Sequence, residues 1–244
     1  MDCVSLSVVI PAHNESAVLR DTLRTVLAQA PDEVIVVCDS CTDDTAAIAR
    51  GAGVTVAEVA TRNVAANRNL GARLSHGEML LMLDADTVVG SGALAAIRAA
   101  GAAGADWGGL TLRPDLPHPL AGPRLAAMNQ ISRRWGWYYG NIYVRRDVLL
   151  AAGGYDESHG WGEDVAVCLR LARVARHTWL PEGYLVYSDR RFRENGYLRE
   201  NATRLRRSLG AIWRHRHEGL RALAPLRAAQ LAPASPAPRS PQQT

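Results

Sequence analysis

Two pairs of carboxylates in this chain could carry out metal-assisted group transfer. Asp84 and Asp86 follow the apolar run 79–83 directly, and Glu163 and Asp164 stand ahead of a segment with helical spacing. Two carboxylates at the carboxyl end of a strand can hold a hard divalent cation such as Mg2+ or Mn2+. A carboxylate from a separate element can then deprotonate an incoming hydroxyl group. The pattern indicates a metal-assisted transfer site, whereas the structural alternatives are solvated turn residues and an acidic first helical turn.

A cluster of arginines follows the last predicted strand. Arg190, Arg191 and Arg193 surround Phe192 in the sequence. Guanidinium groups bind phosphate oxygens in a bidentate geometry. The cluster is therefore a candidate phosphate-binding site, and the alternative is a solvated arginine-rich loop.

The elements that must position these residues alternate regularly in the first hundred residues. Strands are predicted at 4–10, 33–37, 54–59 and 79–83, and helices at 15–28, 42–50 and 65–74. Strands separated by helices form right-handed βαβ units and a parallel sheet, in which ligands bind at the carboxyl ends of the strands. The turn 11–15, Asp39 and the Asp84 segment each follow a strand. We therefore expect three strand ends to supply polar residues to one edge.

The pattern is looser after residues 90–103. Strands are predicted at 107–112, 139–144, 177–180 and 184–187, and helices at 120–134, 164–176 and 197–214. A chain of 244 residues that is 48% hydrophobic can bury one large core. We expect a single α/β domain over residues 1–215, with a Rossmann-like, mostly parallel sheet flanked by helices. The tail 216–244, rich in Pro, Ala and Arg, should be disordered.

Five motifs in the same order resemble those of the family 2 glycosyltransferases of GT-A fold, over about residues 4–193. They are the strand and turn 8–15, the acidic segment 36–45, the Asn67-Arg68-Asn69 helix, Leu83-Asp84-Ala85-Asp86, and Gly153-Gly154-Tyr155-Asp156-Glu157 followed by Glu163-Asp164. Cys38 replaces the first Asp of the family's acidic segment, and Cys41 replaces its Ser. The spacing Cys38-x-x-Cys41 also fits a zinc or redox pair, but no second pair accompanies it in the sequence.

The resemblance implies transfer of a hexose, with inversion, from a nucleotide diphosphate sugar to a hydroxyl acceptor. It divides the domain into a donor-binding half at about 1–112 and an acceptor half at about 113–215. A UDP-sugar is the favoured donor, and Mg2+ or Mn2+ is the implied cofactor. The donor-binding residues would be Pro11, His13, Glu15, Asp39, Arg68, Asp84, Trp161, Arg190 and Arg191.

The same resemblance assigns roles at the reaction centre. Asp86 and Asp84 would ligate the metal, with Asp84 also near the ribose. Asp164 would be the general base, and Glu163 would hydrogen-bond the donor sugar or the acceptor. Asp189 is a candidate third metal ligand where many family members have His. For His13 an unremarkable exposed turn residue is the alternative, and for Trp161 it is core packing.

Other classes of function fit the sequence less well. A nucleotidyltransferase should carry a Gly-rich signature with a basic residue after its first strand, where this chain has Pro11-Ala12-His13-Asn14-Glu15. A Rossmann dehydrogenase needs a G-x-G-x-x-G turn at the same place. A non-catalytic sugar-binding relative remains an alternative. The net charge of only +4, with Arg as every basic residue, does not indicate a nucleic-acid partner.

The ends of the chain suggest a location. The N-terminus has no charged leader, and no apolar run reaches the roughly 20 residues that span a bilayer. We expect a cytoplasmic protein. The predicted last helix places Leu198, Ala202, Leu205, Leu209, Ile212 and Trp213 in one stripe, with arginines away from its centre. This stripe predicts either a peripheral contact with the inner face of the membrane or packing against the catalytic core.

Overall fold

Strand and helix alternate through the first hundred residues, as the sequence predicts. The computed structural model describes residues 4–158 and 162–222. The first elements are β1 (Leu6–Ala12), α1 (Leu19–Leu27), β2 (Glu33–Asp39), α2 (Thr45–Gly51), β3 (Thr55–Val59), α3 (Val64–Leu74), β4 (Met79–Met82), β5 (Val88–Val89) and α4 (Ala93–Ala102). Each predicted strand and helix is present. The two-residue strand β5 was not predicted, because so short a strand shows no periodicity.

The second half of the chain contains shorter and less regular elements. They are β6 (Trp107–Pro114), α5 (Ala121–Trp135), β7 (Ile142–Arg145), α6 (Arg146–Ala151), α7 (Glu163–Val174), β8 (His177–Tyr187), α8 (Arg190–Asn195) and α9 (Tyr197–Ala222). The six-residue helices α6 and α8 were not predicted. Helix α9 continues to Ala222, so the predicted domain boundary at 215 falls inside a helix. Of the tail 216–244 that was predicted to be disordered, residues 216–222 form the end of α9, and residues 223–244 lie outside the described residues, where disorder stays a prediction.

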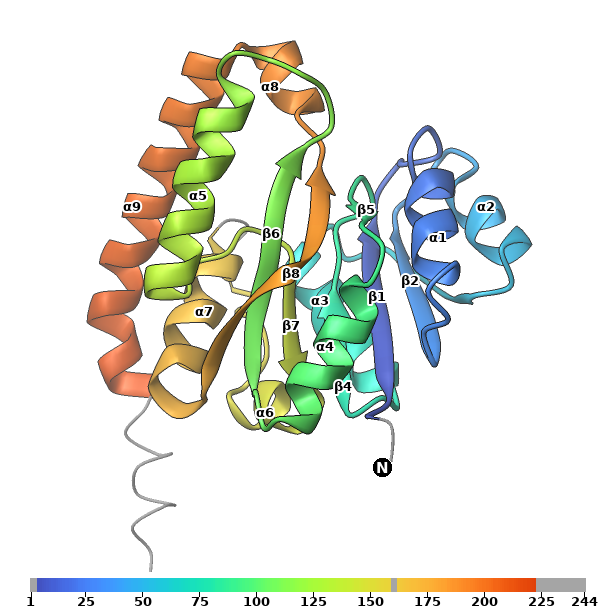
Figure 1. Ribbon diagram of the computed structural model, residues 1–244, viewed down its shortest axis with the longest axis horizontal. Coiled ribbons are helices and arrows are strands. Elements are labelled where there is room, and N and C mark those ends of the chain that lie inside the picture. Colours follow the sequence, from blue (N-terminus) through green and yellow to red (C-terminus); the bar gives the residue numbers. More distant parts are fainter. Residues whose placement is uncertain (1–3, 159–161, 223–244) are drawn as a thin grey trace, which may run out of the picture.

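The described strands form one curled sheet in the order β3-β2-β1-β4-β7-β6-β8-β5 (Figure 1). Strands β3, β2, β1 and β4 are parallel neighbours. Strand β7 is antiparallel to both β4 and β6, β6 is parallel to β8, and β5 is antiparallel to β8. The prediction of a parallel sheet is therefore confirmed for the first half, whereas the second half is mixed. Because β7 is antiparallel to β4, its beginning lies beside the carboxyl end of β4.

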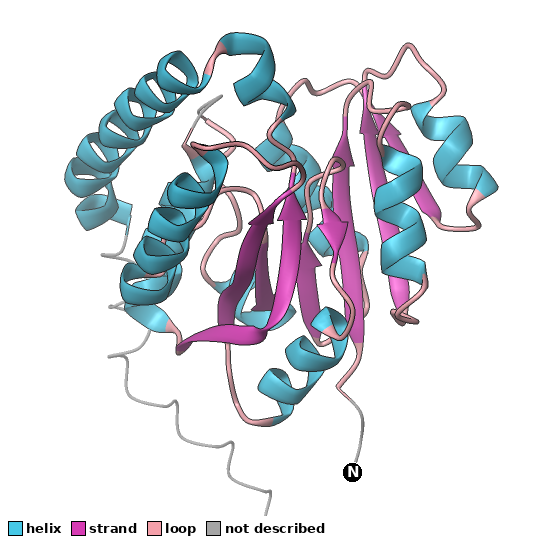
Figure 2. Ribbon diagram, turned by 45° about the horizontal axis from the view of Figure 1, so that its top comes forward, coloured by secondary structure: helices cyan, strands magenta, loops and turns pink. Residues whose placement is uncertain are grey.

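Helices cover both faces of the sheet (Figure 2). Val8 and Ile10 of β1 belong to an apolar cluster that includes residues of α1, α2 and α4. Val9, which points the other way, belongs to a second cluster with residues of α3, α6 and α7. Alternate side chains of a strand face opposite sides of a sheet. A strand that is buried on both faces therefore reads as the continuous apolar run seen in the sequence.

A third cluster joins the ends of four elements of the second half. It contains Ala121 and Leu125 of α5, Tyr187 of β8, Phe192 of α8 and Tyr197 of α9. These residues hold the last two helices against the end of the sheet, near the upper end of α5 in Figure 1. The position of α8, which carries the arginine cluster, therefore depends on this small core.

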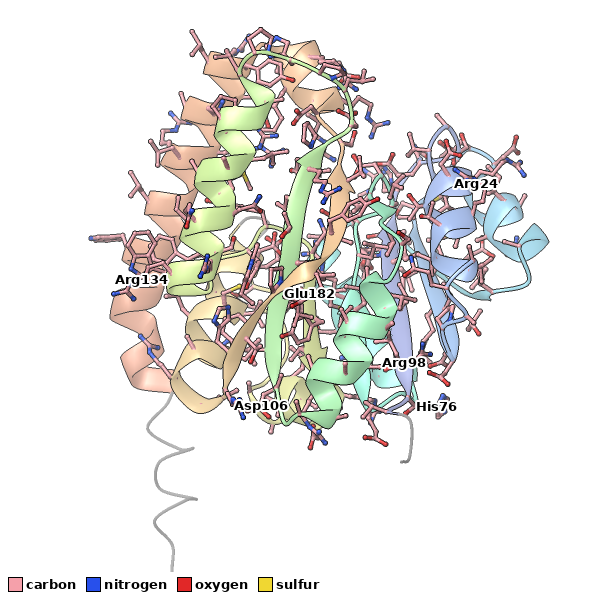
Figure 3. The ribbon with its side chains drawn as sticks, in the orientation of Figure 1. Arg24, His76, Arg98, Asp106, Arg134 and Glu182 are labelled. Carbon is pink, nitrogen blue, oxygen red and sulfur yellow. The ribbon has the colours of Figure 1, made fainter. Side chains whose placement is uncertain are left out.

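Two local features differ from the sequence prediction. Helix α1 begins at Leu19 and not at residue 15, because the preceding residues form a turn in which the Val18 amide donates to the Glu15 carbonyl. Strand β8 is continuous where two short strands were predicted. Its pairing with β6 shifts register after Leu180, and Pro181 and Glu182 lie in this irregularity (Glu182 is labelled in Figure 3). Proline has no backbone donor and is tolerated at such a bulge.

Among the described helices, none combines the length and apolar character that crossing a membrane requires.

Candidate active site

The Asp84 to Asp86 turn leaves β4 at the carboxyl edge of the sheet, and neighbouring elements fix its backbone. The Asp84 amide donates a 2.9 Å hydrogen bond to the Asn141 side chain. The Thr22 hydroxyl donates one of 2.8 Å to the Ala85 carbonyl. Gly140 has a φ of 81°, and a Cβ at this position would overlap the Asp84 carboxylate. Only glycine allows the backbone before β7 to approach Asp84 so closely.

Arg68 brings the two predicted carboxylate pairs together. Its guanidinium lies 2.9 Å from Asp84, 3.1 Å from Glu163 and 2.7 Å from Asp164. The Arg68 side chain, on α3, is only 4% exposed. Glu163 and Asp164 occupy the first turn of α7, so the Arg68 ion pairs join β4 to α7 across 80 residues of sequence.

The charges around Arg68 do not balance, since one cation faces three carboxylates. Burial, followed by the charges of Glu163 and Asp84, raises the pKa of Asp164 to about 7, although Arg68 opposes the shift. The same carboxylates raise the pKa of Arg68, which stays charged. A carboxyl group whose pKa lies near neutrality can both accept and return a proton, which suits a general base.

Helix α3 also connects the other motifs. The Asn67 side chain donates a 2.9 Å hydrogen bond to Asp39 at the end of β2. The Asn69 side chain accepts from the Tyr155 amide at 2.7 Å and donates to the Tyr155 carbonyl at 2.9 Å. Three consecutive residues of α3 therefore contact three different motifs. Their burial explains why polar residues occupy these helix positions, because each one satisfies a specific partner.

Asp86 lies in a second charged group at the opening of the sheet edge. Arg190 of α8 is 2.9 Å from Glu15 and 3.8 Å from Asp86. Burial, then the charges of Asp84 and Glu15, raises the pKa of Asp86 to about 6. Arg191, the next residue, is exposed. The structure thus brings together Asp86, Glu15 and Arg190, as the sequence reasoning expected of residues in one site.

Asp39 has a different environment from these acids. Its carboxylate accepts hydrogen bonds from Thr61 and Asn67 side chains and from the Arg62 and Asn63 amides, at 2.9 to 3.0 Å. These donors hold the pKa of Asp39 well below its usual range, against the effect of burial. Asp39 therefore orders the loop before α3, a use that the sequence alone did not reveal.

The turn after β1 lies beside Asp39 at the same sheet edge. The exposed His13 places its Nδ1 2.6 Å from the Asp39 carbonyl oxygen, and Pro11 is buried in β1. Asn14 has a φ of 53°, and its side chain accepts a 2.8 Å hydrogen bond from the Thr42 amide. The three polar strand ends predicted at one edge are therefore adjacent in the structure.

Asp189 is fully buried and pairs with Arg124, and its second oxygen accepts a 3.3 Å hydrogen bond from the Tyr197 hydroxyl. Both oxygens are thus engaged in the cluster that holds α8, which gives Asp189 a structural role, while its role as a third metal ligand stays a prediction. Trp161 lies outside the described residues.

Sequence reasoning missed three residues that shape the site. Gly140 and Asn141 support Asp84, and Tyr155 lies under Arg68, with the guanidinium 5.3 Å from the ring centre. The Gly-Asn pair before a strand is a turn signal that could have indicated a close backbone approach. Tyr155 gave no comparable signal outside its motif.

The carboxylate oxygens of Asp84 and Asp86 suit a hard cation that takes its other ligands from a substrate. Within residues 4–158 and 162–222, no three His, Cys, Asp or Glu side chains are grouped to hold a metal by themselves. Asp84 and Asp86 nevertheless carry oxygens at one place, where burial, followed by the charges of Asp84 and Glu15, raises the pKa of Asp86. Mg2+ is commonly held by one or two carboxylates together with substrate phosphates.

Comparisons with known proteins agree with this geometry. Residues 7–102 match the model of a family described as Glycosyl transferase family 2. A search of curated proteins gives no match. The matched segment contains β1 to α4 and therefore includes Asp84, Asp86 and Arg68 but not the Glu163-Asp164 pair.

Solved structures share the fold over most of the chain. The 1–349 fragment of TarS from S. aureus is 19% identical with a TM-score of 0.61, over 74% of this chain and 60% of that one. The mannosyltransferase PcManGT from Pyrobaculum calidifontis, in complex with GDP-Man and Mn2+, is 20% identical with a TM-score of 0.62, over 95% and 76%. The glucosyl-3-phosphoglycerate synthase from Mycobacterium tuberculosis, with Mn2+, UDP and glucosyl-3-phosphoglycerate, is 18% identical with a TM-score of 0.55, over 73% and 71%.

At these identities the likeness demonstrates the fold, and it confirms the α/β architecture expected from the motifs. The chain spans only 60% of the length of the TarS fragment.

Proposed function

We propose that this chain, which belongs to the family 2 glycosyltransferases through its residues 7–102, transfers a hexose from a nucleotide diphosphate sugar to a hydroxyl acceptor. The observation that carries the proposal is the contact of Arg68 with both Asp84 and Asp164. This contact places a candidate donor-side carboxylate and a candidate base around one buried cation. Transfer between two substrates requires both groups at one centre.

The donor would lie along the carboxyl ends of β1, β2 and β4. His13 and Glu15 border this edge, and Arg190 and Arg191 approach it from α8. Arg190 contacts Glu15 and lies near Asp86, so a diphosphate would offer it a stronger, bidentate partner. We favour a UDP-sugar, in line with the resemblance. Structures of related fold carry UDP-GlcNAc, UDP or GDP-Man.

Asp86 and Asp84 would hold Mg2+ or Mn2+ between them. When bound, the ion would neutralise charge on the departing diphosphate. Asp84 would keep one oxygen on Arg68 and offer the other, while Asp86 would be ionised by the neighbouring positive charge. Structures of related fold with Mn2+ give independent support for a divalent ion.

Asp164 would act as the general base. It accepts the proton of the acceptor hydroxyl as the oxygen forms a bond to the anomeric carbon, while the bond from that carbon to the diphosphate oxygen breaks. Attack opposite the leaving group inverts the anomeric configuration. Arg68 holds the Asp164 carboxylate in place at 2.7 Å, and Glu163 lies beside it for a hydrogen bond to a sugar hydroxyl. A positioned base contributes about 100-fold to 10,000-fold in rate.

Calorimetry with UDP-, GDP- and dTDP-sugars, each with and without Mn2+, tests the proposal. We expect one nucleotide series to bind only in the presence of the ion, and Asp86→Ala to remove this metal-dependent binding because several kcal/mol of charge neutralisation are lost. Asp21→Ala, at an exposed position on α1, is the matched control and should bind normally. Equal binding by the Asp86→Ala protein would contradict the metal assignment, and no binding of any nucleotide sugar would contradict the function.

A further inference from the structure

Helix α9 turns its apolar stripe outward. Leu198 is 80% exposed, Leu205 61%, Leu209 57% and Trp213 69%. In an ordinary surface helix such a stripe faces the core and polar residues face water. The exposed positions recur at helical spacing, so they form one continuous face.

The inward side of α9 is held by polar contacts. Arg204 donates a 2.8 Å hydrogen bond to the buried Glu200 and one of 2.9 Å to the Tyr187 hydroxyl. The Arg204 guanidinium also lies 4.7 Å from the centre of the Phe192 ring. These contacts fix the rotation of the helix. The alternative prediction that the leucines pack on the catalytic core is therefore wrong for Leu198, Leu205 and Leu209.

Positive charge accompanies the apolar face. Arg199 and Arg206, both exposed, each follow a leucine of the stripe and lie about 100° around the helix from it. The sequence from Tyr197 to Ala222 contains seven Arg and two Glu. Exposed leucines beside arginines are the composition of helices that lie in the interface of an anionic membrane.

We propose that α9 docks the protein on an anionic phospholipid bilayer, with its leucines among the acyl chains and its arginines at the headgroups. A second copy of the chain would be a poorer occupant of this face. Two such helices would bring their arginines together, whereas a bilayer supplies apolar contact and negative charge at once. The inference goes beyond the proposed function.

The location of α9 relative to the site gives the docking a consequence. Only Gly196 separates α9 from α8, which carries Arg190 beside Asp86. The amino-terminal end of α9, and with it part of a bound bilayer, would therefore lie next to α8. Acceptors anchored in the membrane would then be presented to the site at high local concentration.

Vesicle co-sedimentation of the full chain tests the proposal. We expect binding to phosphatidylglycerol vesicles at low salt, at least about tenfold weaker binding to phosphatidylcholine vesicles, and loss of the difference at high salt. Leu205→Ser with Leu209→Ser should reduce partitioning at least about tenfold. Arg199→Gln with Arg206→Gln should weaken it by about fivefold for each arginine.

Matched controls lie on α1 and α3, and α1 stands apart from α9 (Figures 1 and 3). Leu27→Ser with Leu74→Ser removes two partly exposed leucines, and Arg20→Gln with Arg24→Gln removes two exposed arginines. Neither pair should change vesicle binding. Circular dichroism verifies folding, and Leu209→Ser alone replaces the double variant if that protein is unfolded.

Three outcomes would overturn the proposal. They are equal pelleting with neutral and anionic vesicles, unchanged binding of the folded leucine variant, and a concentration-dependent dimer that the leucine variant abolishes. The last result would assign the stripe to a second copy of the chain. Because vesicle binding is measured without donor or acceptor, its failure leaves the proposed transferase activity untouched.

Discussion

Two buried arginines hold carboxylates in this domain, and their charge balance differs. Arg124 pairs with one carboxylate, that of the fully buried Asp189, and its guanidinium lies 4.0 Å from the centre of the Phe192 ring. Arg68 faces three carboxylates, those of Asp84, Glu163 and Asp164. The first pair is neutral, whereas the second group carries an excess of negative charge.

The difference separates a structural ion pair from a candidate active site. A neutral buried pair needs no further ligand, and breaking it leaves an uncompensated charge. A group with excess negative charge raises the pKa of its own acids and attracts a proton or a cation. Burial, and after it the charges of neighbouring carboxylates, raises the pKa of Asp164 and of Asp86. The sequence contains both arginines, but it does not show how many carboxylates each of them faces.

The largest expected effect comes from breaking the ion pair between Arg124 and Asp189. Asp189→Asn should lower the free energy of unfolding by about 3–5 kcal/mol, because the buried guanidinium of Arg124 loses the carboxylate that it pairs with. Urea denaturation measures this change. Asp147→Asn, at an exposed position in the first turn of α6, is the control and should change stability by less than about 0.5 kcal/mol. A stable Asp189→Asn protein would show that the two arginine sites do not differ as stated.

The three carboxylates around Arg68 should respond in the opposite way, because the loss of one of them should not reduce stability. Asp164→Asn removes one of three like charges, so stability should stay within about 1 kcal/mol of the original or rise. Turnover should fall by about 100-fold or more, because the proton acceptor is lost. Steady-state kinetics and urea denaturation on the same preparation measure both quantities. A near-normal rate with a raised KM for the donor would make Asp164 a binding residue.

The pH dependence of metal binding sharpens the comparison at Asp86. Its pKa is raised to about 6, and the ion competes with the proton for the ionised carboxylate. Mn2+-dependent binding of UDP should therefore strengthen as pH rises, by up to about tenfold per unit below pH 6, and level off above it. Calorimetry between pH 5 and pH 8 follows this change, and constant affinity over the range would contradict the role of Asp86.

The smallest expected effect concerns Glu163. Its charge contributes, after burial, to the raised pKa of Asp164, so Glu163→Gln should lower that pKa. The acidic limb of the rate profile should move to lower pH, by up to about one unit. The ratio of rates at pH 6 and pH 8 reports this shift independently of any loss in absolute rate. If the acidic limb of the rate profile did not move, the group that titrates there would not be Asp164.

Sequence reasoning predicted the first half of the fold better than the second. The strands through β4 and the helices between them carry clear patterns, because β1, β2 and β4 are buried on both faces and each helix on one. After β5 the strands are no longer all parallel. This half of the chain also includes the helices α6 and α8, which are too short to show a period. The continuous β8 was hidden by Pro181, whose usual meaning is a break.

The candidate site was predicted in part for a related reason. Asp84, Asp86, Glu163 and Asp164 stood out because strand ends and helix starts are recognisable positions in a sequence. The structural use of Asp39 and Asp189 did not, since it depends on donors from loops and helices distant along the chain. A carboxylate in a motif looks the same whether its partner is a substrate or a buried arginine.

The sequence by itself determined which residues can do chemistry and where along the chain the strands that carry the donor-side motifs lie. Periodicity and residue type are local properties, so they are readable without coordinates. Only the tertiary structure decided that Asn67, Arg68 and Asn69 of α3 join three motifs, and that α9 exposes its leucines. Those outcomes depend on which way a helix is rotated and on which charges meet across it, and neither is encoded in the spacing of one segment.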